Sequence, residues 1–151
     1  MRLNYDCIRD ILIFIADNQR YELLGGNKAY LKEMSYLVIR EAEGIAGVYN
    51  TEDFWYSLNA LEQMDYITVS KVSGGKGGAY ISYDIKDITV AGHEFLNTLK
   101  NPTIWQASVA HVERFAGSKT LSALMTAGKY FIHMAITNPA EFQTMLQTFG
   151  I

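Results

Sequence analysis

Residues 67–85 place two strand-like runs on either side of a glycine-rich stretch, and this pattern limits the folds open to the chain. The second run, AYISYDI at 79–85, alternates Ile81, Tyr83 and Ile85 with polar residues, which is the period of a half-buried strand. The stretch SGGKGG at 73–78 joins it to the first run, ITVSKV. Two such runs with a short glycine-rich connection predict a β-hairpin.

The SGGKGG stretch also has the composition of a phosphate-binding loop. Such a loop needs the pattern G-x-x-x-x-G-K-[ST] and leads from a strand into a helix, whose N-terminus binds the anion. Here Lys76 is followed by Gly77, and the segment leads into a strand. We therefore interpret the stretch as the tip of a hairpin, and we expect no nucleotide or other cofactor.

Helical patterns surround this hairpin. Asn4 caps a helix that ends near Asn18, Asn50 caps another that runs to about Met64, and Thr89 opens a third in which Gly92 allows close approach to the sheet. Between the first two, the glycines near position 25 predict a loop or turn over 21–30. We expect a further helix over about 30–43, which Gly44 ends.

The last third of the chain reads as helical throughout. The pattern predicts a helix over 103–116, a break at Gly117 and Ser118, a helix over about 121–136, and a last helix that NPAE at 138–141 begins. Together with the break at Pro102, this predicts two domains, over 1–101 and 102–151.

The order helix, helix, helix and hairpin is that of a winged-helix domain. The stretches MRLNYDCIRDILIFI, EDFWYSLNALEQMDYI and ITVAGHEFL resemble a family of small bacterial and phage proteins known as a domain of unknown function. The resemblance includes the T-x-x-G-H-E-F-L element at 89–96 and Trp105, covers about residues 1–115, and departs from the family in a longer segment over 21–50. It implies an α+β winged helix-turn-helix with a two-stranded wing, followed by a C-terminal helical extension, and it carries no catalytic residues.

Residues with catalytic or metal-binding chemistry are scattered. His93-Glu94 begins the zinc motif H-E-x-x-H, but position 97 is Asn, so the second ligand is missing. Cys7 lies inside the first helix, and no G-x-S-x-G motif is present. We therefore expect no catalytic residue, no metal site and no enzyme activity.

Composition narrows the class of protein further. Hydrophobic residues make up 49% of the 151 residues, and the net charge is -3, which gives no overall attraction to nucleic acid. A single cysteine excludes an internal disulfide, and together with the lack of a signal pattern it predicts a cytoplasmic protein. Lys129 and His133 interrupt the longest apolar run, 121–136, which falls short of the ~18 residues of a membrane span.

The helix that Asn50 caps is the third along the chain, and this is the element that a winged-helix protein usually places in the DNA major groove. Between Thr51 and Asp65 it has four acidic residues and no Lys or Arg, which phosphates would repel. Its expected outward face suits contact with another protein, since Tyr is enriched at such interfaces. That face consists of Glu52, Tyr56, Asn59 and Gln63.

Two alternatives remain open. A DNA-binding transcriptional regulator would use the basic wing, Lys71, Lys76 and Lys86, to contact phosphates, although the charge of the domain disfavours it. The apolar C-terminal helices either complete one core with the rest of the chain or form a homodimer. The dimer helix would use Leu121, Leu124, Met125, Gly128 and Ile132. The sequence thus predicts a non-catalytic accessory protein, of phage or bacterial origin, that binds a protein partner.

Overall fold

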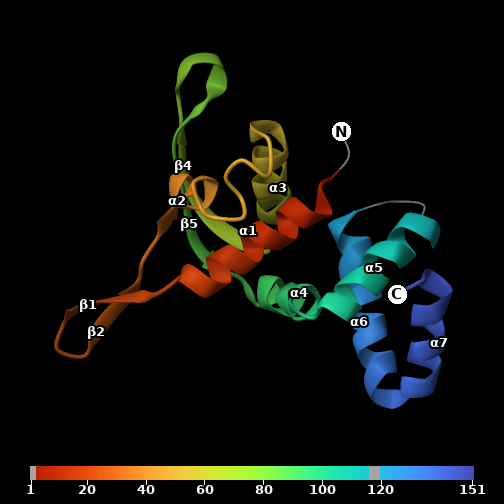
Figure 1. Ribbon diagram of the computed structural model, residues 1–151. Helices are drawn as coiled ribbons and strands as arrows, with labels where there is room; N and C mark the ends of the chain where they lie inside the picture. Colours follow the sequence, from red (N-terminus) through yellow and green to blue (C-terminus); the bar gives the residue numbers. More distant parts are fainter. Residues whose placement is uncertain (1–2, 116–119) are drawn as a thin grey trace. The chain divides into compact units, whose positions relative to one another are not determined.

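The computed structural model describes residues 3–115 and 120–151 and shows a mixed α+β protein (Figure 1). The chain divides into two compact units, one formed by residues 6–93 and the other by residues 94–151 together with the N-terminal residues up to Tyr5. The expected break at Gly117 and Ser118 lies outside the described residues. Each unit is described by itself below.

The unit of residues 6–93 combines three helices with five strands. Its elements in chain order are α1 (Tyr5–Asn18), β1 (Tyr21–Gly25), β2 (Lys28–Leu31), β3 (Met34–Ser35), α2 (Tyr36–Arg40), α3 (Thr51–Gln63), β4 (Ile67–Ser73), the short 3-10 turn η1 (Lys76–Gly78), β5 (Tyr80–Ile88) and the start of α4 (Val90–Lys100). The helices α1 and α3 agree with the prediction, and the Asn50 side chain caps α3 by accepting a hydrogen bond from the Asp53 N–H at 2.7 Å. The predicted hairpin is confirmed as β4–β5, with Lys71 opposite Tyr83.

Three strands form the sheet of this unit in the order β3-β5-β4, all antiparallel. Tyr83 and Ile85 of β5 are fully buried, as the alternating pattern predicts. Ile81 is 67% exposed, because it lies near the hairpin tip, where its side chain comes close to Gly74. Only the base of the hairpin therefore contributes to the core.

The loop predicted over 21–30 is wrong. Residues 21–31 form a second hairpin, β1–β2, in which Tyr21 pairs with Leu31 and Leu23 with Ala29. Gly26 and Asn27 make the turn, and Gly25 at the end of β1 and Gly26 have φ of 103° and 61°, in a region that favours glycine. We call this hairpin the ribbon; Figure 1 shows it extending away from the three-stranded sheet.

The helix predicted over 30–43 is also wrong at both ends. Met34 and Ser35 form β3 and pair with Ile85 and Asp84 of β5, so this part of the chain is extended. The Ser35 hydroxyl then accepts a hydrogen bond from the Leu37 N–H and begins α2, which ends at Arg40. A long-range strand pairing here overrides a local helical pattern.

The expected close approach of α4 to the sheet is confirmed. The Thr89 hydroxyl caps α4 by accepting from the Gly92 N–H at 3.0 Å, and it donates to the backbone carbonyl of Asp65. A Cβ at Gly92 would lie 2.1 Å from the carbonyl oxygen of Tyr66. Only glycine therefore fits at this crossing.

The unit of residues 94–151 is helical. Besides the end of α4 it contains α5 (Pro102–Phe115), α6 (Leu121–Thr137) and α7 (Pro139–Phe149), with α6 packed against both α5 and α7. The predicted start of α7 is confirmed, since the Asn138 side chain accepts from the Glu141 N–H at 3.3 Å. Among the described residues, no helix has both the length and the apolar character to cross a bilayer.

Candidate functional site

An aromatic groove lies between α3 and the tip of the β4–β5 hairpin. Its volume is about 440 Å³, and its lining consists of Tyr36, Trp55, Asn59, Gly77, Gly78, Ala79 and Tyr80. The Trp55 ring centroid lies 4.9 Å from that of Tyr36 and 5.7 Å from that of Tyr80. Each of these three side chains is partly exposed, so the groove presents a row of aromatic rings to solvent.

The position of each ring follows from its element. Tyr36 is the first residue of α2, Trp55 lies in the second turn of α3, and Tyr80 begins β5. Asn59 follows Trp55 by one helical turn, so both side chains point to the same face of α3. Glycines at 77 and 78 leave that wall of the groove without side chains, which opens it to a ligand backbone.

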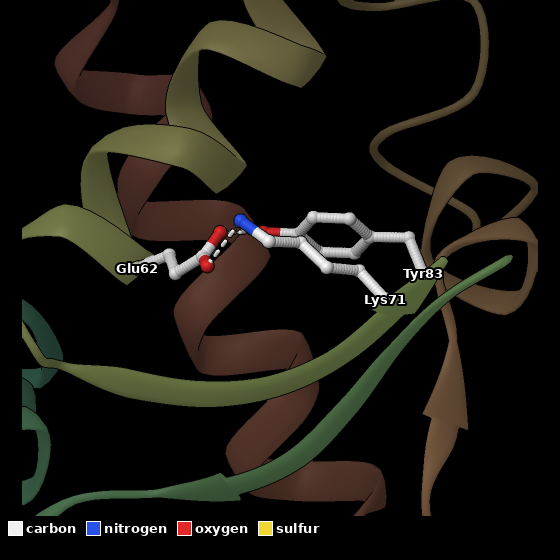
Figure 2. Close-up of polar contacts among 3 residues, drawn as sticks. All are labelled: Glu62, Lys71 and Tyr83. Atoms are coloured by element: carbon white, nitrogen blue, oxygen red, sulfur yellow. Dashed lines mark hydrogen bonds and ion pairs between the residues drawn. The ribbon is translucent and has the colours of Figure 1, made fainter. Parts of the chain in front are cut away.

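A polar trio beside the groove joins α3 to the hairpin (Figure 2). One carboxylate oxygen of Glu62, Oε1, accepts from Lys71 Nζ at 2.6 Å, and the other, Oε2, accepts from the Tyr83 hydroxyl at 2.9 Å. The Lys71 ammonium also lies 5.7 Å from the Tyr80 ring centroid, within the range of a cation-π contact. The trio therefore holds the hairpin in place against α3.

The trio shifts the pKa of two of its members. Burial, reinforced by the hydrogen bond to Glu62, raises the pKa of Tyr83 far above its ordinary value. The hydrogen bond to Glu62 likewise raises the pKa of Lys71, whose side chain is partly exposed. Both groups therefore keep their protons throughout the neutral range.

The expected outward face of α3 is exposed at three of its four residues. Glu52, Tyr56 and Gln63 are exposed, whereas Asn59 is partly buried and lines the aromatic groove. The face and the groove therefore form one continuous surface on α3.

The three lysines expected to contact phosphates occupy different settings. Lys71 is ion-paired with Glu62, Lys76 is exposed at the hairpin tip, and Lys86 is exposed near the hairpin base, where its backbone carbonyl accepts from the Gln19 side chain at 2.9 Å. One of the three positive charges is therefore neutralised by a residue of α3 itself.

The residues of the expected dimer helix are mostly covered within the chain. Leu121, Leu124, Met125 and Gly128 are buried, and Ile132 is partly buried. The side chain of Thr98 in α4 lies so close to Gly128 that a Cβ there would be 2.3 Å from it. These residues are therefore covered within the helical unit itself, and both a core shared with the rest of the chain and dimerisation stay predictions.

The three histidines and Cys7 lie in different parts of the structure and do not form a common site. His93 and His133 are exposed, and His111 packs among the rings of Phe115, Phe131 and Phe149 in the helical unit. Burial raises the pKa of the Cys7 thiol, whose Sγ lies 3.7 Å from the carbonyl oxygen of Asp53. Over residues 3–115 and 120–151, no group of three or more His, Cys, Asp and Glu side chains could hold a metal ion.

A second hollow, of about 660 Å³, lies in the helical unit. His111, Thr120, Ser122, Thr126 and Tyr130 supply its polar lining, and Val112, Ala123, Ala127 and Met145 supply the rest. The Nδ1 atom of His111 is buried and has no hydrogen-bond partner in the part of the chain that the structure describes. Within the described ranges, the lining contains no carboxylate and no Lys or Arg that could polarise a bound substrate.

Sequence reasoning found the exposed face of α3 but missed the groove beside it. Tyr36, Trp55 and Tyr80 are far apart in the sequence, and only the pairing of β3 with β5 brings α2 close to the hairpin. The available signal was the Phe-Trp-Tyr run at 54–56, in which a buried ring is followed by two that are partly exposed.

The family described as "Hypothetical protein (DUF2513)" matches residues 2–119. The match covers most of the 151 residues, and the chain therefore belongs to this family of unknown function. No curated protein and no solved structure matches the chain significantly.

Proposed function

We propose that this chain is a non-catalytic accessory or regulatory protein, of phage or bacterial origin, that acts by binding another protein. In this proposal residues 6–93 are a winged helix, with α1, α2 and α3 as its helices and β4–β5 as its wing. The order of these elements supports the assignment, as does β3, which extends the wing to a three-stranded sheet.

The observation that carries the proposal is the character of α3. It presents Glu52, Tyr56 and Gln63 to solvent, and the helix sequence TEDFWYSLNALEQ contains no Lys or Arg. Nonspecific affinity for DNA comes mainly from cations that neutralise phosphates, and a reading helix usually supplies some of them. A surface with an exposed Tyr beside acidic and amide side chains is instead typical of a protein–protein interface.

The alternative, a DNA-binding regulator, depends on the wing. Lys76 and Lys86 are exposed and available to phosphates, but Lys71 already has a carboxylate partner at 2.6 Å. Residues 1–100 contain ten Lys and Arg and fourteen Asp and Glu, a net charge of 10 - 14 = -4. The proposal therefore favours a protein partner.

Capture of a partner from a host lysate with the wild type and a Tyr56→Ala variant tests the proposal. Tyr130→Ala is the matched control, because Tyr130 on α6 is 52% exposed and Tyr56 is 40% exposed. We expect a partner that the wild type and the control retain and that the Tyr56 variant loses at least ~10-fold, as for a central interface aromatic.

Titration of labelled duplex DNA at low and at higher salt tests the alternative. We expect no salt-sensitive binding. Binding that weakens steeply with salt, and whose slope becomes flatter in a Lys71→Ser, Lys76→Ser variant, would replace the protein-binding proposal with the regulator.

A further inference from the structure

We infer that the aromatic groove binds a proline-rich segment of the partner in the polyproline II conformation. The inference rests on the proposed function and names the kind of sequence that the α3 surface recognises. Three properties of the groove carry it: its row of rings, its unused hydrogen-bond donors and its charge.

The row of rings matches the shape of a polyproline helix. Tyr36, Trp55 and Tyr80 lie side by side, with interplanar angles to Trp55 of 44° and 31°, so their faces are tilted rather than perpendicular to one another. A polyproline II helix rises about 3.1 Å per residue and presents a pyrrolidine ring every third residue on one side. Aromatic-lined grooves are the usual partners of such ridges, because the extended ligand loses little conformational entropy on binding.

The groove also offers donors that nothing in the described part of the chain uses. The side chains of Tyr36, Trp55, Asn59 and Tyr80 make no hydrogen bond there. The indole N–H of Trp can only donate, and the Tyr hydroxyls and the Asn59 amide can donate as well. A proline-rich segment has backbone carbonyl acceptors and few N–H donors. Its carbonyl groups can therefore accept hydrogen bonds from the donors that line the groove.

Charge decides between a peptide and a nucleic-acid strand, since unstacked bases also bind aromatic rings. The Lys71 ammonium, which lies over the Tyr80 ring, is ion-paired with Glu62, and Lys76 precedes the lining glycines at the hairpin tip. One exposed cation cannot bind a run of phosphates, but it complements a single acidic residue that flanks a proline run.

Peptide titration of the intact chain tests the inference. In a Trp105→Phe background, Trp55 is the remaining tryptophan, because the sequence has two. The probes are a decaproline peptide, the same peptide with one terminal Glu, a Gly-Ser peptide of equal length, and a single-stranded decathymidine. We expect Trp55 fluorescence to change with both proline peptides and not with the other two.

Variants then assign the contacts, with calorimetry as the measurement. Replacement of a ring, Trp55→Leu, should weaken decaproline binding at least ~10-fold, and Asn59→Ala should weaken it about 5-fold through one lost hydrogen bond. Lys76→Ser should remove the advantage of the Glu-bearing peptide and leave decaproline unchanged. Tyr130→Ala, at an exposed tyrosine outside the groove, should change neither affinity.

Two results would overturn the inference: proline peptides that bind no better than the Gly-Ser peptide, and decathymidine that binds more tightly than decaproline. The proposed function has a separate outcome. If a captured partner depends on Tyr56 while the proline peptides fail to bind, a protein still binds α3 and only the class of segment assigned to the groove is wrong.

Discussion

Each of the two hairpins of residues 6–93 takes part in a trio of Glu, Lys and Tyr side chains, and the two trios lie in different environments. In the ribbon, Glu22 accepts from Lys32 at 2.8 Å and from the Tyr30 hydroxyl at 2.5 Å. At the β4–β5 hairpin, Glu62 of α3 accepts from Lys71 at 2.6 Å and from the Tyr83 hydroxyl at 2.9 Å. Tyr30 is 42% exposed, whereas Tyr83 is fully buried. Because the Tyr83 ring is buried and the Tyr30 ring is exposed, the tyrosine hydrogen bond should contribute little in the ribbon and substantially at the β4–β5 hairpin.

The largest expected difference concerns the apolar side chains of the two hairpins. Ile85→Ala, at a fully buried position of β5, should lower the free energy of unfolding by ~3 kcal/mol. Leu23→Ala, at a ribbon position that is 79% exposed, should change it by less than ~0.5 kcal/mol. Urea unfolding followed by Trp55 fluorescence, in the Trp105→Phe background, measures both. Equal losses would show that the ribbon is packed as firmly as the β4–β5 hairpin.

The next difference concerns the two tyrosine hydroxyls. Tyr83→Phe removes a hydrogen bond to a charged acceptor in a buried setting and should cost ~1.5 kcal/mol. Tyr30→Phe removes the corresponding bond in the ribbon, where solvent replaces it, and should cost less than ~0.5 kcal/mol. The same unfolding measurement compares the two. A larger loss for Tyr30→Phe would contradict the role assigned to burial.

The smallest expected difference appears only at high pH. The pKa of Tyr83 is raised in the folded state, so its stabilising contribution is complete below its ordinary pKa of about 10 and is lost as the pH rises toward the folded-state value. The free energy of unfolding should therefore fall between about pH 9.5 and 11, and Tyr83→Phe should make this fall shallower. Tyr49, whose pKa burial and Asp10 also raise, contributes in the same direction. A slope unchanged in Tyr83→Phe would exclude Tyr83 as a source.

The contrast between the hairpins also explains what the sequence could predict. The β4–β5 hairpin was predictable because the alternation of Tyr83 and Ile85 follows a glycine-rich tip, and both signals are local. In the ribbon, Tyr21 and Leu23 of β1 lie on the same face as Ala29 and Leu31 of β2. The apolar Leu24 interrupts the alternation of apolar and polar residues. The local turn propensity of the glycines then decides the prediction. An isolated two-stranded hairpin gains too little stability from burial to leave a stronger signal in the sequence.

Long-range pairing accounts for the other misses. Leu37 and Val38 continue a helical pattern that began at Leu31, yet Met34 pairs with Ile85 across the sheet and keeps the chain extended until Ser35. The same pairing brings Tyr36 to Trp55, so the groove was hidden from sequence reasoning for the same reason. The exposed face of α3 was predictable because it depends on helical periodicity alone.

The ribbon is a two-stranded sheet, and both its outer edges leave backbone N–H and C=O groups without strand partners. One face bears Tyr21 and Leu23, which are 66% and 79% exposed. Such a segment can template aggregation when the protein is concentrated, and the flanking Lys28 and Lys32 act as charged gatekeepers against it. A Leu23→Lys substitution should therefore raise solubility during purification without disturbing the core.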